Sequence, residues 1–247
     1  MKKKLTSVLT ATILLGLVSS PLALAEDKSP ALSKQQSTQS TQDIIKTLKK
    51  IPLPSSYYVE YKVYNPKNEL ESINEYWADV KQSKVLLKSQ MMSQVVTSPT
   101  GEKRINQGST LYNLYDKQWF YAYTPYLPLN KKAIKVKDTK TFTFIRDIDG
   151  LEEASKHGTT YVYENQEKIN GRMAYHFTST YEGMPAGDIW IDTATGIWVK
   201  QTSPNNVLQI ATKFEVNPKF SNKTFTIPLP AGLTFKEYPS IAEAMSR

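Results

Sequence analysis

The 247-residue sequence has no cysteine and only two histidines, His157 and His176. The absence of cysteine excludes disulfide bonds, thiol catalysis, cysteine-ligated metals and lipid attachment to a cysteine. Two histidines so far apart in sequence do not form a metal site of recognisable spacing. We therefore expect no metal and no cofactor, and a fold that is held by its hydrophobic core alone.

The sequence also lacks the common enzyme motifs: Gly-x-Ser-x-Gly, Ser-x-x-Lys, His-Glu-x-x-His and the P-loop. We expect no enzyme and no catalytic residues, with an envelope hydrolase as the least favoured alternative. The formal net charge is +8, but no arginine-rich patch accompanies it, so nucleic acid is not an expected partner. Lys135 and Lys137 share one strand face, which indicates a solvated face, with weak attraction to anionic lipid as the alternative.

The N-terminus has the parts of a secretory signal peptide. A basic stretch is followed by a mostly apolar stretch over residues 5–18 and by a small-residue cleavage site that ends at Ala25. We expect residues 1–25 to be a signal peptide, residues 26–41 a flexible polar segment, and residues 42–247 a single domain. No later segment has the ~20 apolar residues of a membrane helix. The expected location is the periplasm or another space outside the cytoplasm.

Hydrophobic periodicity favours a mainly β, α+β fold. Apolar residues at helical spacing predict a short helix over residues 42–51 and a second one over residues 149–158. Alternating polar and apolar residues predict about ten strands, among them residues 84–96, 134–145 and 223–230. Strands at such short spacing favour one large, curved antiparallel sheet with a few helices against it.

The stretch GDIWIDTATGIWVKQ, residues 187–201, carries two aspartates, Asp188 and Asp192. On a strand they lie about 13 Å apart, whereas the two carboxylates of a glycosidase lie roughly 5 to 9.5 Å apart. Asp192 can accept a hydrogen bond from the backbone two residues on, and Gly196 can adopt a left-handed conformation. The stretch therefore predicts a β-hairpin rather than a catalytic pair.

Aromatic residues make up 11% of the chain and are the feature of the sequence that favours binding of a hydrophobic ligand. A curved sheet with an apolar concave face can enclose a hydrophobic ligand. The alternative is that these side chains fill a core beneath the helices, which composition alone favours.

Three stretches resemble the superfamily of periplasmic lipoprotein-sorting carriers, the LolA-like proteins, which includes RseB-like sensors. They are the paired strands of STLYNLYDKQWFYAYTP, the hairpin of residues 187–201, and the C-terminal stretch KFEVNPKFSNKTFTIPLPAGLTF. The resemblance covers about residues 40–238. It implies an incomplete barrel, closed on its concave side by helices, around an apolar cavity for acyl chains.

The resemblance implies an exported, non-enzymatic carrier of lipid or of lipoprotein acyl chains, with envelope membrane proteins as further partners. The alternative is an RseB-like envelope-stress sensor that acts through a protein partner. The basic residue with which the carriers hold their closing helices has no clear counterpart; Lys84 and Lys88 are the candidates. The candidate wall residues of the cavity are Val59, Tyr61, Val63, Trp119, Tyr121, Tyr123, Tyr175, Phe177, Ile189 and Ile191.

Overall fold

The computed structural model describes residues 40–97, 100–123, 133–137, 147–221 and 223–246. They belong to the compact unit Gln39–Arg247. The predicted signal peptide, nearly all of the predicted polar segment and the second half of the predicted strand 134–145 lie outside the described residues.

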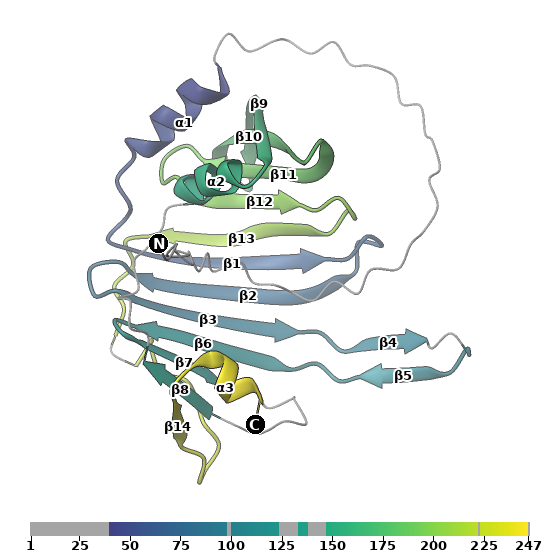
Figure 1. The fold of residues 1–247 in the computed structure, drawn as a ribbon, viewed down its shortest axis with the longest axis vertical. Helices are drawn as coiled ribbons and strands as arrows, with labels where there is room; N and C mark the ends of the chain where they lie inside the picture. Colours follow the sequence, from purple (N-terminus) through teal and green to yellow (C-terminus); the bar gives the residue numbers. More distant parts are fainter. Residues whose placement is uncertain (1–39, 98–99, 124–132, 138–146, 222, 247) are drawn as a thin grey trace, which may run out of the picture. The chain divides into compact units, whose positions relative to one another are not determined.

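Twelve strands form one curved sheet that does not close into a barrel (Figure 1). Neighbouring strands run antiparallel, except for the parallel pair β14 and β8 at one edge. From that edge to the other, the order is β14 (Phe235–Tyr238), β8 (Ala133–Lys137), β7 (Trp119–Tyr123), β6 (Thr110–Asp116), β3 (Lys84–Met91), β2 (Leu70–Asp79), β1 (Ser56–Tyr64), β13 (Leu208–Val216), β12 (Trp198–Thr202), β11 (Met184–Asp192), β10 (Arg172–Tyr181) and β9 (Thr159–Ile169). The predicted fold class is confirmed.

A separate ribbon of β4 (Gln94–Thr97) and β5 (Lys103–Asn106) extends beyond the ends of β3 and β6 (Figure 1). The prediction of one continuous strand over residues 84–96 is therefore wrong. The main chain of Met91 exchanges two hydrogen bonds with Ser109, and Gly108 approaches so closely that a Cβ there would clash with the Met91 oxygen. This close crossing ends β3, and the chain re-pairs beyond it as a hairpin.

Both predicted helices are present, as α1 (Thr41–Lys49) and α2 (Asp147–Lys156), and a third, α3 (Ile241–Ser246), was not predicted. Ser40 caps α1, because its hydroxyl accepts a hydrogen bond from the main chain of Asp43. Gly158, with a φ of +95°, follows the end of α2, as expected.

All three helices pack on one side of the sheet, which we call the helix face. Helices α1 and α2 cover Phe177 and Ile191 of β10 and β11. At the other end, α3 packs with Phe120 and Val136 of β7 and β8. Residues paired across antiparallel strands point to the same side. The pairing of the strands therefore shows which residues of the middle strands lie on the helix face. One row of paired residues consists of Val63, Gln209, Gln201 and Ile189. Another consists of Val59, Tyr76, Leu87 and Asn113.

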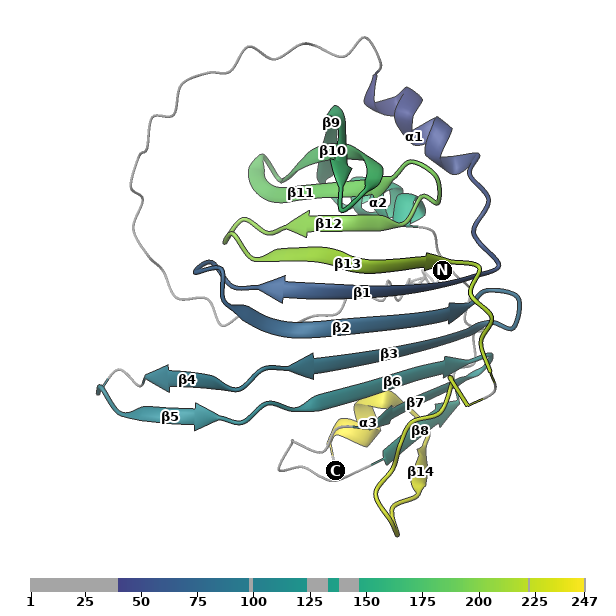
Figure 2. The ribbon, with the colours of Figure 1, turned by 180° about the vertical axis from the view of Figure 1, so that it is seen from behind.

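The opposite side, the outer face, is covered at one end by the C-terminal segment. The prediction of a strand over residues 223–230 is wrong: the segment has no ladder, and Pro228 and Pro230 have no N–H to donate to one. Instead Phe225, Ile227 and Leu229 pack on the side chains of β3, β6 and β7. Figure 2 shows this segment running past the strand ends to β14.

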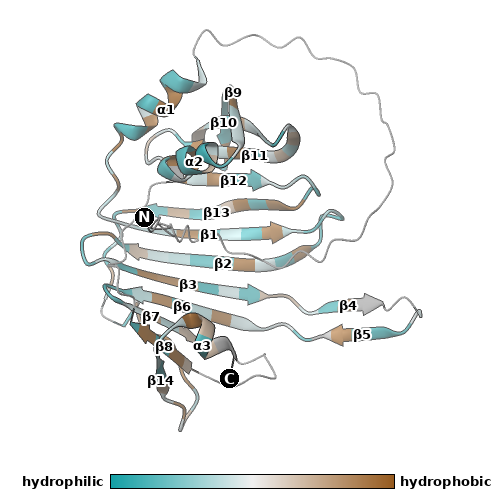
Figure 3. Ribbon diagram, in the orientation of Figure 1, coloured by the Kyte–Doolittle hydropathy of each residue, from teal (hydrophilic) through white to brown (hydrophobic). Residues whose placement is uncertain are grey.

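Polar and apolar residues alternate along the middle strands β1 and β13 (Figure 3). This period of two gives each strand one side for the core and one for solvent or for a second layer. Hydrophobic clusters lie on the helix face at the two ends of the sheet and on the outer face at one end. A further buried cluster joins Val59 and Tyr61 of β1 to Ala174 of β10, Trp190 of β11 and Val199 of β12.

The predicted hairpin of residues 187–201 is confirmed, and Asp192 closes it. Its side chain is 2% exposed and accepts hydrogen bonds from Arg172, at 2.5 Å from Nη2, and from the hydroxyl of Thr195. It also accepts, at 3.4 Å, from the main chain of Ala194, and Gly196 has a φ of +70°. Asp192 therefore joins β10 to the β11–β12 turn.

We expect Asp192→Ala to lower the free energy of unfolding by about 3 kcal/mol, because it leaves Arg172 and Thr195 without their acceptor. Asp192→Asn, which keeps one acceptor oxygen, should cost clearly less. Urea denaturation followed by tryptophan fluorescence measures both. Equal, small losses in the two variants would show that this carboxylate does not hold the hairpin.

Candidate functional site

The ten candidate wall residues do not share one face. Seven lie on the helix face and three, Trp119, Tyr121 and Tyr123, lie on the outer face. The register shows this, because Tyr121 pairs with Leu114, and Leu114 with Leu86, in a row separate from that of Val59 and Leu87. The set therefore cannot line a single surface.

Four of the seven lie beneath α1 and α2. Phe177 and Ile191 are fully buried against Leu48 and Ile148, and Tyr175 and Ile189 pack around them. Tyr163 meets Tyr175 and Phe177 edge-on. These residues form a filled core under the helices.

On the outer face, Tyr123 is buried and Tyr121 half-buried in the cluster that the C-terminal segment covers. Tyr121 meets Phe235 edge-on at 5.2 Å between ring centres. Burial, followed by the nearby charge of Asp116, raises the pKa of Tyr121 above its ordinary value. Trp119 lies at the end of this cluster, under the ammonium group of Lys135 at 3.7 Å.

The remaining three residues, Val59, Tyr61 and Val63, form the centre of the helix face on β1. Together with Tyr76 of β2 and Leu87 of β3 they make an apolar strip, which we call the central strip. Tyr61 stacks on Trp198 at 3.9 Å between ring centres, meets Tyr76 edge-on and donates its hydroxyl to the Trp198 carbonyl. Val59, Tyr61, Val63 and Leu87 are at most 7% exposed.

One polar pair lies within the central strip. Ser89 of β3 donates a 2.6 Å hydrogen bond to the side-chain oxygen of Asn74 of β2, and Asn74 pairs in register with Tyr61. Asn74 is buried. The pair puts hydroxyl and amide groups beside an aromatic ring, an arrangement suited to the polar end of an apolar ligand. Sequence reasoning missed Asn74, Tyr76 and Leu87, although the alternation of Asn74 and Tyr76 with Glu75 and Trp77 was visible.

The same strands carry charge on their outer face. Glu60 pairs with Lys213 of β13 and Glu75 pairs with Lys88 of β3, each at 2.6 Å. Tyr58 donates its hydroxyl to Glu75. Burial and this hydrogen bond raise the pKa of Tyr58 well above its ordinary value. Lys84 and Lys88 are the two candidates for the basic residue that holds the closing helices in the carriers. Lys88 pairs with Glu75 on the outer face, and Lys84 pairs with Asp116 at 3.3 Å.

The two aspartates, Asp188 and Asp192, have separate partners. Asp188 lies 3.1 Å from His176 Nε2, whereas Asp192 binds Arg172. The ring of His176 points away from the helix core and stacks on Trp190, whose indole donates to Glu167. Among the described residues, no group of three potential ligands is placed to hold a metal ion. The two carboxylates do not face a common point as a catalytic pair would.

No protein-family model matches the chain, and no curated protein matches it. Several solved structures are similar in chain path. An uncharacterised conserved protein from Thermus thermophilus is 10% identical, with a TM-score of 0.47, over 80% of this chain and 98% of its own. MucB, of the RseB-like type, is 11% identical with a TM-score of 0.45, and the match covers 76% of this chain and 62% of MucB.

MucB from Pseudomonas aeruginosa has also been solved in complex with MucA. PNGF-II is 10% identical with a TM-score of 0.42, over 77% of this chain and only 32% of its own. These likenesses are of low sequence identity and concern the course of the chain. No helix among the described residues is long and apolar enough to cross a bilayer.

The ion pair of Glu60 with Lys213 on the outer face should make the free energy of unfolding depend on pH. Burial raises the pKa of this carboxyl, but the hydrogen bonds from Lys213 and Thr212 and the charge of Lys213 outweigh it, so the pKa is lowered overall. A carboxyl whose pKa is lower in the folded state stabilises the fold above its unfolded value of about 4.3. That stabilisation is lost as the pH falls through the folded value.

We therefore expect the difference in unfolding free energy between the natural protein and Glu60→Gln to be largest near neutral pH. It should shrink steadily below a pH of about 4. Urea denaturation across this range measures it. The charge-removing variant Lys213→Gln should show the same loss at neutral pH, and a difference that does not change with pH would contradict the assignment.

Proposed function

We propose that the protein is an exported, non-enzymatic carrier that holds the acyl chains of a lipid or lipoprotein against the central strip. The N-terminal sequence, with its basic, apolar and small-residue regions, supports export. The two carboxylates with separate partners support a role without catalysis.

One observation carries the proposal: strands β1, β2 and β3 have an apolar, aromatic helix face and a charged outer face. Val59, Tyr76 and Leu87 lie in one row on the helix face. Glu60, Glu75 and Lys88 lie in the adjacent row on the outer face. An apolar ligand therefore has one side of these strands to bind, and water has the other.

Among the described residues, no helix packs on the central strip. The described helices pack over β9–β11 at one end and over β7, β8 and β14 at the other, and the central strip lies between them. Val59 and Tyr61 are buried in a cluster with Val199 and Ala211, so a ligand would enter when this packing opens beside the half-buried Tyr76. Each methylene group that leaves water contributes about 0.8 kcal/mol, so a long acyl chain can bind without covalent chemistry.

A pair of matched tyrosines tests the proposal. Tyr76 is on the helix face and Tyr121 on the outer face, and both are half-buried. We expect Tyr76→Ala to weaken binding of a fluorescent long-chain fatty acid by about tenfold, for roughly 1.5 kcal/mol of lost contact. Tyr121→Ala should leave binding unchanged.

Fluorescence titration measures the affinities, and urea denaturation shows whether the two variants lose similar stability. Native mass spectrometry of the protein purified without detergent shows whether an acyl lipid is bound. Equal weakening in both variants, or no uptake of the fatty acid by the natural protein, would overturn the carrier.

A second candidate function, a sensor that acts through a protein partner, rests on the β4–β5 ribbon. Val95 and Ile105 pair across it and are 62% and 71% exposed. These two side chains lie close to where the ribbon leaves the main sheet, and together they offer a partner one exposed apolar contact. We expect Val95→Ser with Ile105→Ser to abolish capture of a specific envelope protein while fatty-acid binding persists; capture that is unaffected would remove the ribbon from this role.

A further inference from the structure

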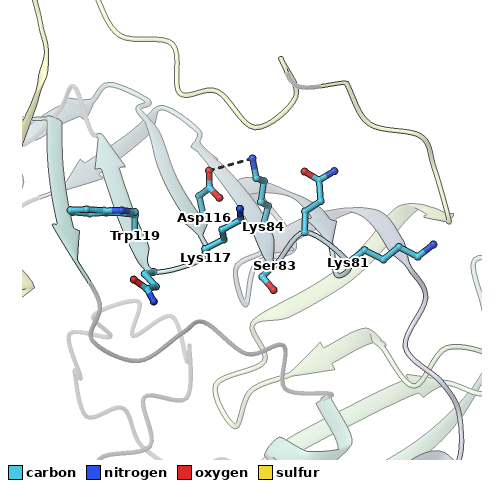
Figure 4. A pocket seen from close by; sticks show the side chains of 8 residues that line it. Lys81, Ser83, Lys84, Asp116, Lys117 and Trp119 are labelled. Atoms are coloured by element: carbon cyan, nitrogen blue, oxygen red, sulfur yellow. Dashed lines mark ion pairs between the residues drawn. The ribbon is translucent and has the colours of Figure 1, made fainter.

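Two neighbouring turns border an open pocket of about 780 Å³ at one end of the sheet (Figure 4). One turn, residues 80–83, joins β2 to β3, and the other, residues 117–118, joins β6 to β7. The Lys117 N–H donates to the Ser83 carbonyl at 3.0 Å, which ties the turns together. Ser83 and Lys117 both have φ near +55°, so each turn is tight.

The pocket is rich in positive charge. Lys81, Lys84 and Lys117 line it, against a single carboxylate, Asp116. Asp116 is engaged by Lys84 at 3.3 Å (Figure 4). Lys81 and Lys117 are exposed, and among the described residues neither has an ion-pair partner. Two ammonium groups therefore remain for an anion from outside.

An aromatic side chain borders the same pocket and extends the positive charge. Trp119 lines the pocket, and Lys135 lies 3.7 Å above its ring and Lys137 5.9 Å away. Lys135 also lies 3.6 Å from Glu237, whereas Lys137 is exposed. Tryptophan beside several lysines is the side-chain combination that settles at the boundary between lipid headgroups and water.

We propose that this pocket binds the phosphate of an anionic phospholipid headgroup and so docks the protein on a membrane surface. Lys117 contacts the phosphate, Lys81 adds positive charge at the rim of the pocket, where Figure 4 shows it extending away from Lys117, and Trp119 contacts the headgroup boundary. The charge of the site is opposite to that of such a surface, and each lysine near an anionic bilayer strengthens binding roughly fivefold. The inference does not require acyl-chain carriage, because the pocket and the central strip share no residue.

The experiment is co-sedimentation of the protein with two kinds of vesicle. One kind is phosphatidylcholine alone, and in the other phosphatidylglycerol replaces part of it. We expect binding only to the second kind, and weaker binding at high salt. The variant Lys81→Gln with Lys117→Asn should bind roughly twentyfold more weakly; asparagine is chosen because it tolerates the positive φ of residue 117.

The matched control removes two exposed lysines outside the pocket, Lys67 in the β1–β2 turn and Lys168 on β9, as Lys67→Gln with Lys168→Gln. It carries the same net charge as the pocket variant and should keep nearly full binding. Equal loss in both variants, or binding without preference for phosphatidylglycerol, would overturn the docking site.

Inorganic phosphate separates the two sources of a phosphate ligand. If the membrane surface is the ligand, phosphate releases the protein from vesicles no better than chloride of equal ionic strength. Specific release by phosphate, lost in the pocket variant, would overturn docking on lipid in favour of a soluble phosphate. The fatty-acid titration of the same pocket variant should be unchanged, so this proposal and the carrier can fail separately.

Discussion

A sheet that does not close has two faces to cover and two edges to protect, and the rest of this structure follows from that constraint. The three helices meet it on one face only, at the two ends of the sheet. On the other face the C-terminal segment covers one end, and the middle is charged and needs no cover. The middle of the helix face, with Tyr61 and Tyr76, is apolar as well. Among the described residues, no helix packs on it.

A helix also lies next to the strand at each edge of the sheet. At β9 the edge N–H of Tyr163 donates to the hydroxyl of Thr41, so the first residue of α1 occupies a hydrogen-bonding position that another strand could use. At the opposite edge β14 adds as the parallel neighbour of β8, and α3 follows it directly. The helices at the two ends therefore cover apolar side chains and protect the edges of the sheet at the same time.

Much of this architecture could be predicted from the sequence. Which residues of different strands lie on the same face of the sheet could not. Alternation correctly placed Val59, Tyr61 and Val63 on one side of their strand, and it placed Trp119, Tyr121 and Tyr123 on one side of theirs. Whether two such sets face each other or face apart depends on the register of every strand between them, which the pattern within each strand does not contain. The C-terminal segment misled for a related reason, because Phe225 and Ile227 alternate like strand residues but pack as an unpaired cover.

The central strip and the lysine pocket share strand β3, which constrains how they act together. Lys84 begins β3 and Leu87 lies three residues further along it, a distance of about 10 Å. Lys84, Asp116 and Trp119 of the pocket lie on the outer face, whereas the strip lies on the helix face. Docking as we propose it would therefore bring the strand ends to the membrane and leave the strip facing away from the bound lysines. The two contributions differ in their response to salt, because screening weakens the lysines whereas apolar burial is not weakened. If both proposals hold, the protein would leave a membrane when its electrostatic contact is lost and would still keep an acyl chain against β1, β2 and β3.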